Sequence, residues 1–215
     1  MNQLIVSATS LEIRPFMERI RKEPVPDTDI LVTGIGLTAA TWHIAHQLQL
    51  KKYDRVIQAG VAGCFDNRIP LGSVLAIKQE AIADESVVEL KNLKTLFDLK
   101  LVPQDSHPYK KGWLLNPHKD LLKAAKPKTV KGVSVNQIST DKKMIGFYRE
   151  HFNPVTESME GAALHYVCLQ ENMPFIQLRS ISNIVGERNR DKWIMKEAIE
   201  NLNIQLQQLI KNLNG

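Results

Sequence analysis

The chain has 215 residues, of which 43% are hydrophobic and 24% charged, with a formal net charge of +5; this is the composition of a folded globular protein. No apolar run is long enough to cross a bilayer, and the first fifteen residues lack the features of a signal peptide, so we expect a cytoplasmic protein with no membrane partner. The lysines are scattered rather than clustered with aromatic residues, which argues against a nucleic-acid partner.

Short apolar runs rich in valine and isoleucine recur along the chain, as is typical of strands in a sheet covered on both faces. They lie at 4–8, 30–34, 55–60, 73–83, 131–139 and 174–182. Helical periodicity follows at 38–50, with Thr38 as the expected N-cap, at 159–171, and along the C-terminal stretch. Strands alternating with helices predict an α/β fold, and the lack of a linker predicts a single domain over 1–215.

The least patterned part of the chain is the region 84–128, which contains four prolines. Such a segment is either irregular surface or a functional loop.

Two glycine-rich segments follow predicted strands. "GIGLTA" (34–39) has the form of a dinucleotide-binding turn, but it follows the second strand, and Asp54 precedes the next strand instead of ending it. The amides near Gly34 and Gly36 could instead hold a small oxygen-rich group. "AGVAGC" (59–64) is either a tight strand-to-helix turn or a place where backbone approaches a ligand.

Histidines supply no clear metal site. His43 and His46 have a helical spacing of three residues, but no third ligand accompanies them, so no metal is expected.

Two glutamates are placed where a carboxylate could act on a ligand. Glu160, in "TESMEGAALHY" (156–166), could accept hydrogen bonds from the two hydroxyls of a sugar diol, or could merely favour the start of a helix. Glu12 follows the first strand, where it could act as a general base on water, although any loop after a strand can carry an acid.

The order of these segments resembles the nucleoside phosphorylase and nucleosidase superfamily over nearly the whole chain. "SMEGAA" and "RSISN" resemble its M-E-x-x-A and R-x-[IV]-S-[DN] signatures, and "SNIVGERNRDKW" looks most like the futalosine hydrolase branch, beside the 5′-methylthioadenosine/S-adenosylhomocysteine nucleosidases. The resemblance implies a three-layer α/β/α nucleoside phosphorylase-like fold with a central mixed sheet flanked by helices. It also implies no metal or organic cofactor, and at least a homodimer in which 84–118 could cover a neighbour's site.

The resemblance assigns roles to particular residues. Glu12 matches the acid that activates water, and Glu160 matches the acid that holds the ribose hydroxyls, with Met159 beside the sugar. The remaining matches are to backbone or base contacts, and they comprise Gly34 and Gly36 near the ribose, Ala59, Gly60 and Gly63 near the sugar and base, Ile138 where an aromatic often stacks, and Asn183 at the N7 edge of the purine.

Two of the matched positions bear on the reaction. Phosphorylases of the superfamily carry an arginine where this chain has Gln58, and a neutral amide cannot replace a guanidinium as a phosphate ligand, so water is the expected nucleophile. Asn183 stands where methylthioadenosine nucleosidases have Asp; its amide can pair with a 6-oxo group and N7–H, which favours hypoxanthine or guanine over adenine.

The resemblance therefore predicts hydrolysis of futalosine to release hypoxanthine in menaquinone biosynthesis. Arg188, Arg190 and Lys192 either meet the benzoate at the far end of futalosine or form a solvated charged loop. The alternatives are a nucleosidase for methylthioadenosine, S-adenosylhomocysteine or 6-amino-6-deoxyfutalosine, and a non-catalytic nucleoside-binding protein.

Overall fold

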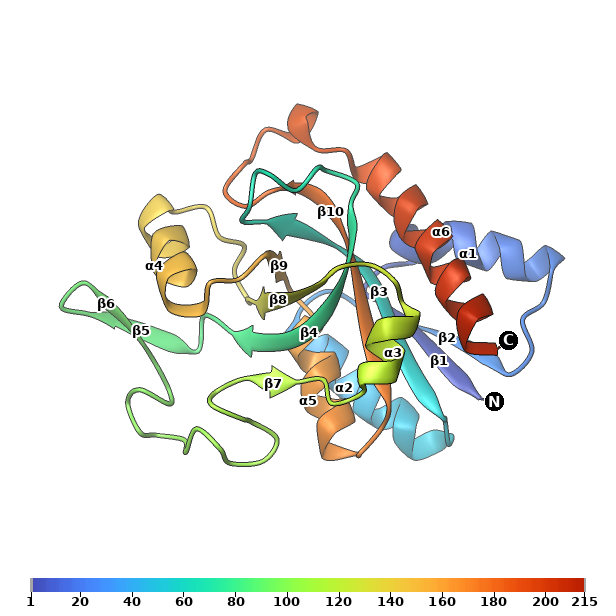
Figure 1. The fold of residues 1–215 in the computed structure, drawn as a ribbon, viewed down its shortest axis with the longest axis horizontal. Coiled ribbons are helices and arrows are strands. Elements are labelled where there is room, and N and C mark those ends of the chain that lie inside the picture. Colours follow the sequence, from blue (N-terminus) through green and yellow to red (C-terminus); the bar gives the residue numbers. More distant parts are fainter. Residues whose placement is uncertain (1, 215) are drawn as a thin grey trace.

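The computed structural model describes residues 2–214, and these form a central β-sheet with helices packed on both faces (Figure 1). The helices are α1 (Ser10–Lys22), α2 (Leu37–Leu50), α3 (Lys119–Ala124), α4 (Lys142–Phe152), α5 (Gly161–Gln170), α6 (Met195–Asn214) and one turn of 3₁₀ helix (Arg190–Lys192). The strands are β1 (Gln3–Ser7), β2 (Thr28–Val32), β3 (Arg55–Cys64), β4 (Val74–Ile82), β5 (Ser86–Glu89), β6 (Asn92–Thr95), β7 (Leu114–Leu115), β8 (Thr129–Ser134), β9 (Thr156–Ser158) and β10 (Phe175–Ile184).

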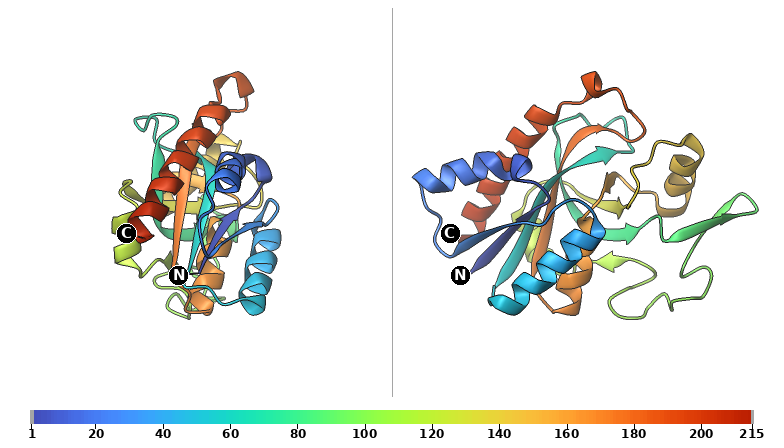
Figure 2. Two further views of the ribbon diagram at one scale, coloured as in Figure 1. Left: turned by 90° about the vertical axis from the view of Figure 1, so that its right-hand side faces the viewer. Right: turned by 180° about the vertical axis from the view of Figure 1, so that it is seen from behind.

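Alternate residues of the central strands feed two separate cores. Ile5, Ile57 and Ile176 pack against α1 and α6, whereas Leu4, Val56 and their neighbours pack against α2 and α5. This follows from the period of two along a strand. The left view of Figure 2 shows α6 on one side of the sheet and α2 on the other. The predicted three-layer α/β/α arrangement is therefore confirmed.

The main sheet has eight strands and is mixed. Strands β1, β2, β3 and β10 pair in parallel, while β10 with β4 and β3 with β9 are antiparallel. Because β10 pairs with both β3 and β4, the strands β10, β4, β8, β9 and β3 close into a ring. The runs of valine and isoleucine identified the strands but not this closure, which depends on pairing between distant segments.

Of the two interpretations of 59–64, the tight strand-to-helix turn was wrong. Strand β3 continues through Ala59, Gly60 and Gly63 to Cys64 because β10 pairs with it along this length and β9 pairs with its end. The side chain of Ala59 is fully buried and packs in the core beside α1 and α6. These residues approach the site as parts of a strand, and only some of them face it.

Three helix starts differ from expectation. The segment after β1 begins helix α1 at Ser10 with Thr9 as its N-cap, so Glu12 lies in the first turn of a helix instead of in a loop. Helix α2 has Gly36 as its N-cap residue, not Thr38. Helix α5 begins at Gly161, so Glu160 is its N-cap residue.

The region 84–128 is only partly irregular. It contains the hairpin β5–β6, the short strand β7 and helix α3. The hairpin projects from the body of the molecule in Figure 1 and again in the right view of Figure 2. Leu90 at its tip is 92% exposed, so the hairpin presents an apolar tip to solvent.

Within residues 2–214, no helix is long and apolar enough to cross a membrane. The same residues hold no cluster of three or more histidine, cysteine or acidic side chains able to bind a metal ion. Cys64 and Cys168 are both free and buried.

Candidate active site

A cavity of about 330 Å³ opens where the carboxyl-end halves of β3 and β10 meet the start of α1 and the β9–α5 junction. Seven of the residues proposed from sequence line it, namely Glu12, Gly63, Ile138, Met159, Glu160, Asn183 and Arg188. Gly34, Gly36, Ala59 and Gly60 are not among the described lining residues. The structure thus brings together side chains up to 176 positions apart, between Glu12 and Arg188.

Glu12 is held by three hydrogen-bond donors. Its Oε2 accepts the Thr9 N–H at 3.0 Å and the Thr9 hydroxyl at 2.8 Å, and its Oε1 accepts the Val61 N–H at 3.0 Å. Thr9 and Glu12 together form a capping box at the start of α1. The carboxylate is 7% exposed, so a buried acceptor faces the cavity in a fixed orientation.

Glu160 is fixed by the glycine turn of the second strand. Its Oε1 accepts the Gly36 N–H at 3.0 Å, and Gly34 and Gly36 have φ angles of +82° and +97°, which favour glycine. The glycines of the turn therefore orient the carboxylate, and Ile35 between them lines the cavity. Glu160 is 5% exposed, and Met159 precedes it on the cavity wall.

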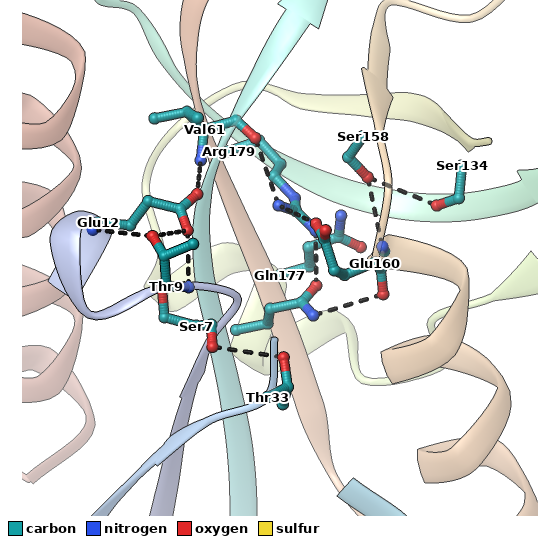
Figure 3. Close-up of polar contacts among 12 residues, drawn as sticks. Ser7, Thr9, Glu12, Thr33, Val61, Ser134, Ser158, Glu160, Gln177 and Arg179 are labelled. Carbon is teal, nitrogen blue, oxygen red and sulfur yellow. Dashed lines mark hydrogen bonds and ion pairs between the residues drawn. The ribbon is translucent and has the colours of Figure 1, made fainter. Parts of the chain in front are cut away.

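Arg179 links the two carboxylates, and sequence reasoning gave it no role. Its guanidinium lies 3.5 Å from Glu160 Oε2 and donates a hydrogen bond to the Val61 carbonyl at 3.3 Å (Figure 3). The N–H of the same Val61 donates to Glu12. The guanidinium also donates to Gln58 Oε1 at 3.0 Å. A Cβ on Gly60 would lie 2.4 Å from Nη1 of Arg179. The only sign of Arg179 in the sequence was that it is the single charged residue in the apolar run 174–182.

Beneath Glu160 lies a second buried acid, Glu80. It accepts hydrogen bonds from Gln177 at 2.9 Å and from the Ser134 hydroxyl at 3.4 Å. Complete burial raises the pKa of Glu80 to about 7. A Cβ on Gly161 would lie 2.1 Å from its Oε1, so glycine at the first position of α5 lets that helix start directly above this network.

A β-bulge re-aims the end of β10 toward the cavity. The register with β3 shifts between Ile181 and Asn183, and bulges of this kind commonly redirect side chains beside functional sites. Asn183 Nδ2 donates to the Ile184 carbonyl at 3.0 Å, and its Oδ1 accepts from the Ser182 hydroxyl at 2.8 Å. One N–H and one lone pair of the amide stay available to a ligand.

Glu157 is a further acid on the cavity wall that sequence reasoning missed. Burial is the main cause that raises its pKa, with the charge of Asp84 acting in the same direction and the contact with Ser139 opposing it. It immediately precedes the recognised "SMEGAA" motif, so its place beside the motif was its only signal.

Ile138 and Arg188 lie where the wall of the cavity is exposed to solvent. Ile138 is 46% exposed. The Arg188 guanidinium lies 5.6 Å from the centre of the Trp193 ring, and both residues line the cavity. The described lining holds four carboxylates, Glu12, Glu157, Glu160 and Glu187, against the single cation Arg188.

The geometry supplies a buried base for water, a carboxylate able to hold a diol, and an amide with one donor and one acceptor free. This combination suits cleavage of a bond between a sugar and a nitrogen base. It offers no cluster of cations for a phosphate among the described residues of the lining.

Comparison with known proteins gives a consistent family. Residues 29–213 match the phosphorylase superfamily. The chain is 27% identical over 205 residues to the 5′-methylthioadenosine/S-adenosylhomocysteine nucleosidase of Colwellia psychrerythraea, covering 88% of this chain and 79% of that protein. It is 27% identical over 184 residues to the futalosine hydrolase of Streptomyces coelicolor, covering 80% and 73%. The solved structure of the Colwellia nucleosidase in complex with adenine superposes with a TM-score of 0.79 at 22% identity, covering 99% of this chain and 96% of that one.

Proposed function

The chain belongs to the phosphorylase superfamily, and from this premise we propose that it is a futalosine hydrolase. It is an N-glycosyl hydrolase of the kind to which its nucleosidase and hydrolase relatives belong. The proposed reaction releases hypoxanthine from futalosine and supplies menaquinone biosynthesis. The observation that carries the proposal is the convergence of Glu12, Glu160 and Asn183 on one cavity.

Glu12 is proposed as the base that activates water. Donors from Thr9 and Val61 occupy three of the roughly four acceptor positions of its carboxylate, which leaves one for a water molecule on the cavity side. That water attacks the anomeric carbon and transfers a proton to Glu12, while the carbon–nitrogen bond breaks and its electron pair leaves with the base. The departing base takes up a proton from solvent at N7, and Asn183 Oδ1 accepts the resulting N7–H. A fixed carboxylate at this position suits catalysis better than simple binding, since binding alone would need no base.

Glu160 is proposed to hold the ribose 2′- and 3′-hydroxyls as positive charge builds on the sugar. Arg179 and the Gly36 N–H fix the carboxylate before substrate arrives. A preorganised negative charge beside a developing oxocarbenium ion stabilises the transition state more than the ground state.

Gln58 supports water, and not phosphate, as the nucleophile. It is 2% exposed, accepts from Arg179 and donates to the Glu160 carbonyl at 3.4 Å. Both ends of its amide are therefore engaged inside the protein, and it presents no positive charge to a phosphate dianion.

Asn183 supports a 6-oxo base. The Ile184 carbonyl needs an N–H donor, so it fixes which end of the amide is nitrogen. In this orientation the free N–H can donate to O6 and the free lone pair of Oδ1 can accept N7–H. A flip to suit a 6-amino base would set the Asn183 oxygen against the Ile184 carbonyl, leaving two acceptors face to face.

Arg188 supports a substrate with an anionic 5′ substituent. It is the one cation of the described lining, it is exposed, and it stacks over Trp193. A benzoate could pair with the guanidinium and pack on the indole. Lys192 is instead paired with Glu187 at 2.7 Å and is absent from the described lining. We further propose a cytoplasmic homodimer or higher oligomer, with 84–118 covering the neighbour's site.

A second candidate, a 5′-methylthioadenosine/S-adenosylhomocysteine nucleosidase, is supported by the equal identity to the Colwellia relative. The deciding experiment is a panel of futalosine, 6-amino-6-deoxyfutalosine, inosine and methylthioadenosine, with released base measured by chromatography. We expect the highest kcat/KM for futalosine. Faster release of adenine from methylthioadenosine would establish the second candidate, and binding of nucleosides with no release of base would make the protein a non-catalytic binder.

A further inference from the structure

A buried amide side chain joins helix α6 to the helix that carries Glu12. Asn203 is 1% exposed, and among the residues of α6 that the structure describes as buried it is the only polar one. Its Nδ2 donates to the Glu12 carbonyl at 2.8 Å and to the Ile199 carbonyl at 2.7 Å. Its Oδ1 accepts the Phe16 N–H at 3.1 Å. Helices α1 and α6 lie side by side on one face of the sheet (Figure 1), so the amide ties Glu12 to a segment 191 positions away.

The amide takes part in the hydrogen-bond ladder of α1. In a regular α-helix the Phe16 N–H would donate to the Glu12 carbonyl, four residues earlier. Here Asn203 accepts from the first group and donates to the second, so its side chain bridges them. One position before Phe16, Pro15 has no N–H for the Leu11 carbonyl, and its ring crowds that carbonyl. Proline and an inserted side chain are both causes of helix kinks, so the first turn of α1 depends on Asn203 for its position.

Glu12 is thus held at both ends. Thr9 and Val61 donate to its carboxylate, and Asn203 donates to the carbonyl of the same residue. A displacement of about 1 Å in a reacting group can cost on the order of a hundredfold in rate, so the backbone contact bears on turnover. Resting on the proposed role of Glu12 as the base, we infer that Asn203 is a positioning residue, which fixes the first turn of α1 relative to β3 and so aims the Glu12 carboxylate at the attacking water.

The chemistry of the side chain explains why asparagine belongs there. Two backbone carbonyls need donors and one N–H needs an acceptor, and asparagine supplies two N–H groups and one carbonyl oxygen. Aspartate would set a carboxylate against both carbonyls. Leucine would suit the apolar face that Leu202 and Leu206 form on the same helix, but it would make none of the three bonds. Asn203 is not among the described residues that line the cavity, so its contacts act on Glu12 and not on substrate.

The test is Asn203→Ala, with kcat and Kd for futalosine measured separately. We expect kcat to fall at least about tenfold, because the Phe16 N–H can then bond directly to the Glu12 carbonyl and the first turn of α1 shifts. Kd, measured by calorimetry, should stay within about threefold, since no contact with substrate is lost. Gln205→Ala is the matched control. The amide of Gln205 also joins α6 to a backbone carbonyl, that of Ala125 at 2.8 Å, but it does not touch α1, so its loss should leave kcat at the wild-type value.

A double-mutant cycle separates positioning of the base from a general loss of structure. If Asn203 acts through the Glu12 carboxylate, adding Asn203→Ala to Glu12→Gln should not lower the residual kcat any further. If the two losses instead multiply, Asn203 acts independently of the base, and the inference is overturned.

A second variant, Asn203→Leu, keeps the test decisive if Asn203→Ala does not fold. Leucine fills the space of the amide and leaves the Glu12 carbonyl and the Phe16 N–H free to bond to each other, so this variant should fold and lose kcat to a similar extent. A wild-type kcat in either folded variant would overturn the role of Asn203 and leave the proposed function standing. A wild-type protein that releases base from no nucleoside would overturn the proposed function and this inference together.

Discussion

Replacing Glu12 by glutamine separates its chemical role from its structural one. The carboxylate accepts donors on both oxygens, from Thr9 on Oε2 and from Val61 on Oε1. Glutamine has one oxygen and one NH2, so in either orientation a backbone N–H faces the NH2. Leaving one buried donor unpaired costs about 1–3 kcal/mol of unfolding free energy. For a chain of this length that is a fall in Tm of about 2–4 °C for each kcal/mol.

The effect of Glu12→Gln on turnover should be far larger than its effect on stability. Loss of a general base removes a factor of roughly 10² to 10⁴ in kcat, because the amide cannot take a proton from water. Substrate binding should stay within about tenfold, since the base edge and the ribose keep Asn183 and Glu160. The assay follows hypoxanthine release from futalosine, with binding measured by calorimetry and Tm by thermal unfolding.

Thr9→Ala is the matched control. It removes the N-cap of α1 and one donor to Glu12, which costs about 0.5–2 kcal/mol, but it leaves the carboxylate in place. Its Tm should fall by an amount similar to that of Glu12→Gln, while kcat falls less than about tenfold. A Glu12→Gln enzyme with the wild-type kcat would refute the assignment of the base. A Thr9→Ala enzyme as inactive as Glu12→Gln would show that geometry, and not proton transfer, accounts for the loss.

Three further predictions follow from the same contacts. Phosphate should not accelerate cleavage, because Gln58 brings no charge to the site; a ribose 1-phosphate signal in phosphorus NMR would contradict the hydrolytic mechanism. Asn183→Asp should lower kcat/KM for futalosine and raise it for 6-amino-6-deoxyfutalosine, since it removes the N–H that faces O6; an unchanged ratio would mean that Asn183 does not read the base. Burial raises the pKa of Glu80 from 4.5 to about 7, so the folded protein binds that proton more tightly than the unfolded chain. The unfolding free energy should therefore fall by about 3 kcal/mol as pH rises from about 4.5 to 7. Measured by urea unfolding at pH 5 and at pH 8, this loss of unfolding free energy should be absent from Glu80→Gln. An equal loss in the two proteins would exclude Glu80 as its source.

The sequence alone was enough to locate six of the ten described strands and seven residues that line one cavity. Runs of β-branched residues marked β1, β2, β3, β4, β8 and β10, because a strand buried on both faces must be apolar at successive positions. Glu12 and Asn183 follow two such runs, where the ends of neighbouring strands gather, whereas Glu160 lies at the start of a predicted helix and was connected with them only through the family resemblance. Helix α1 was missed because the segment contains Pro15, although Thr9 and Glu12 form a capping box and Ile13, Phe16, Met17 and Ile20 follow the helical spacing.

Tertiary structure decided what the glycines and the buried charges do. Gly60 and Gly63 suggested a turn, but pairing with β9 and β10 satisfies their backbone groups, so the strand continues through them. Their missing side chains make room for Arg179 beside Gly60 and for Val185 and Asn183 beside Gly63. No local pattern could supply this, because each of those contacts joins Gly60 or Gly63 to a residue more than 110 positions away, and only the pairing of β3 with β10 brings them together.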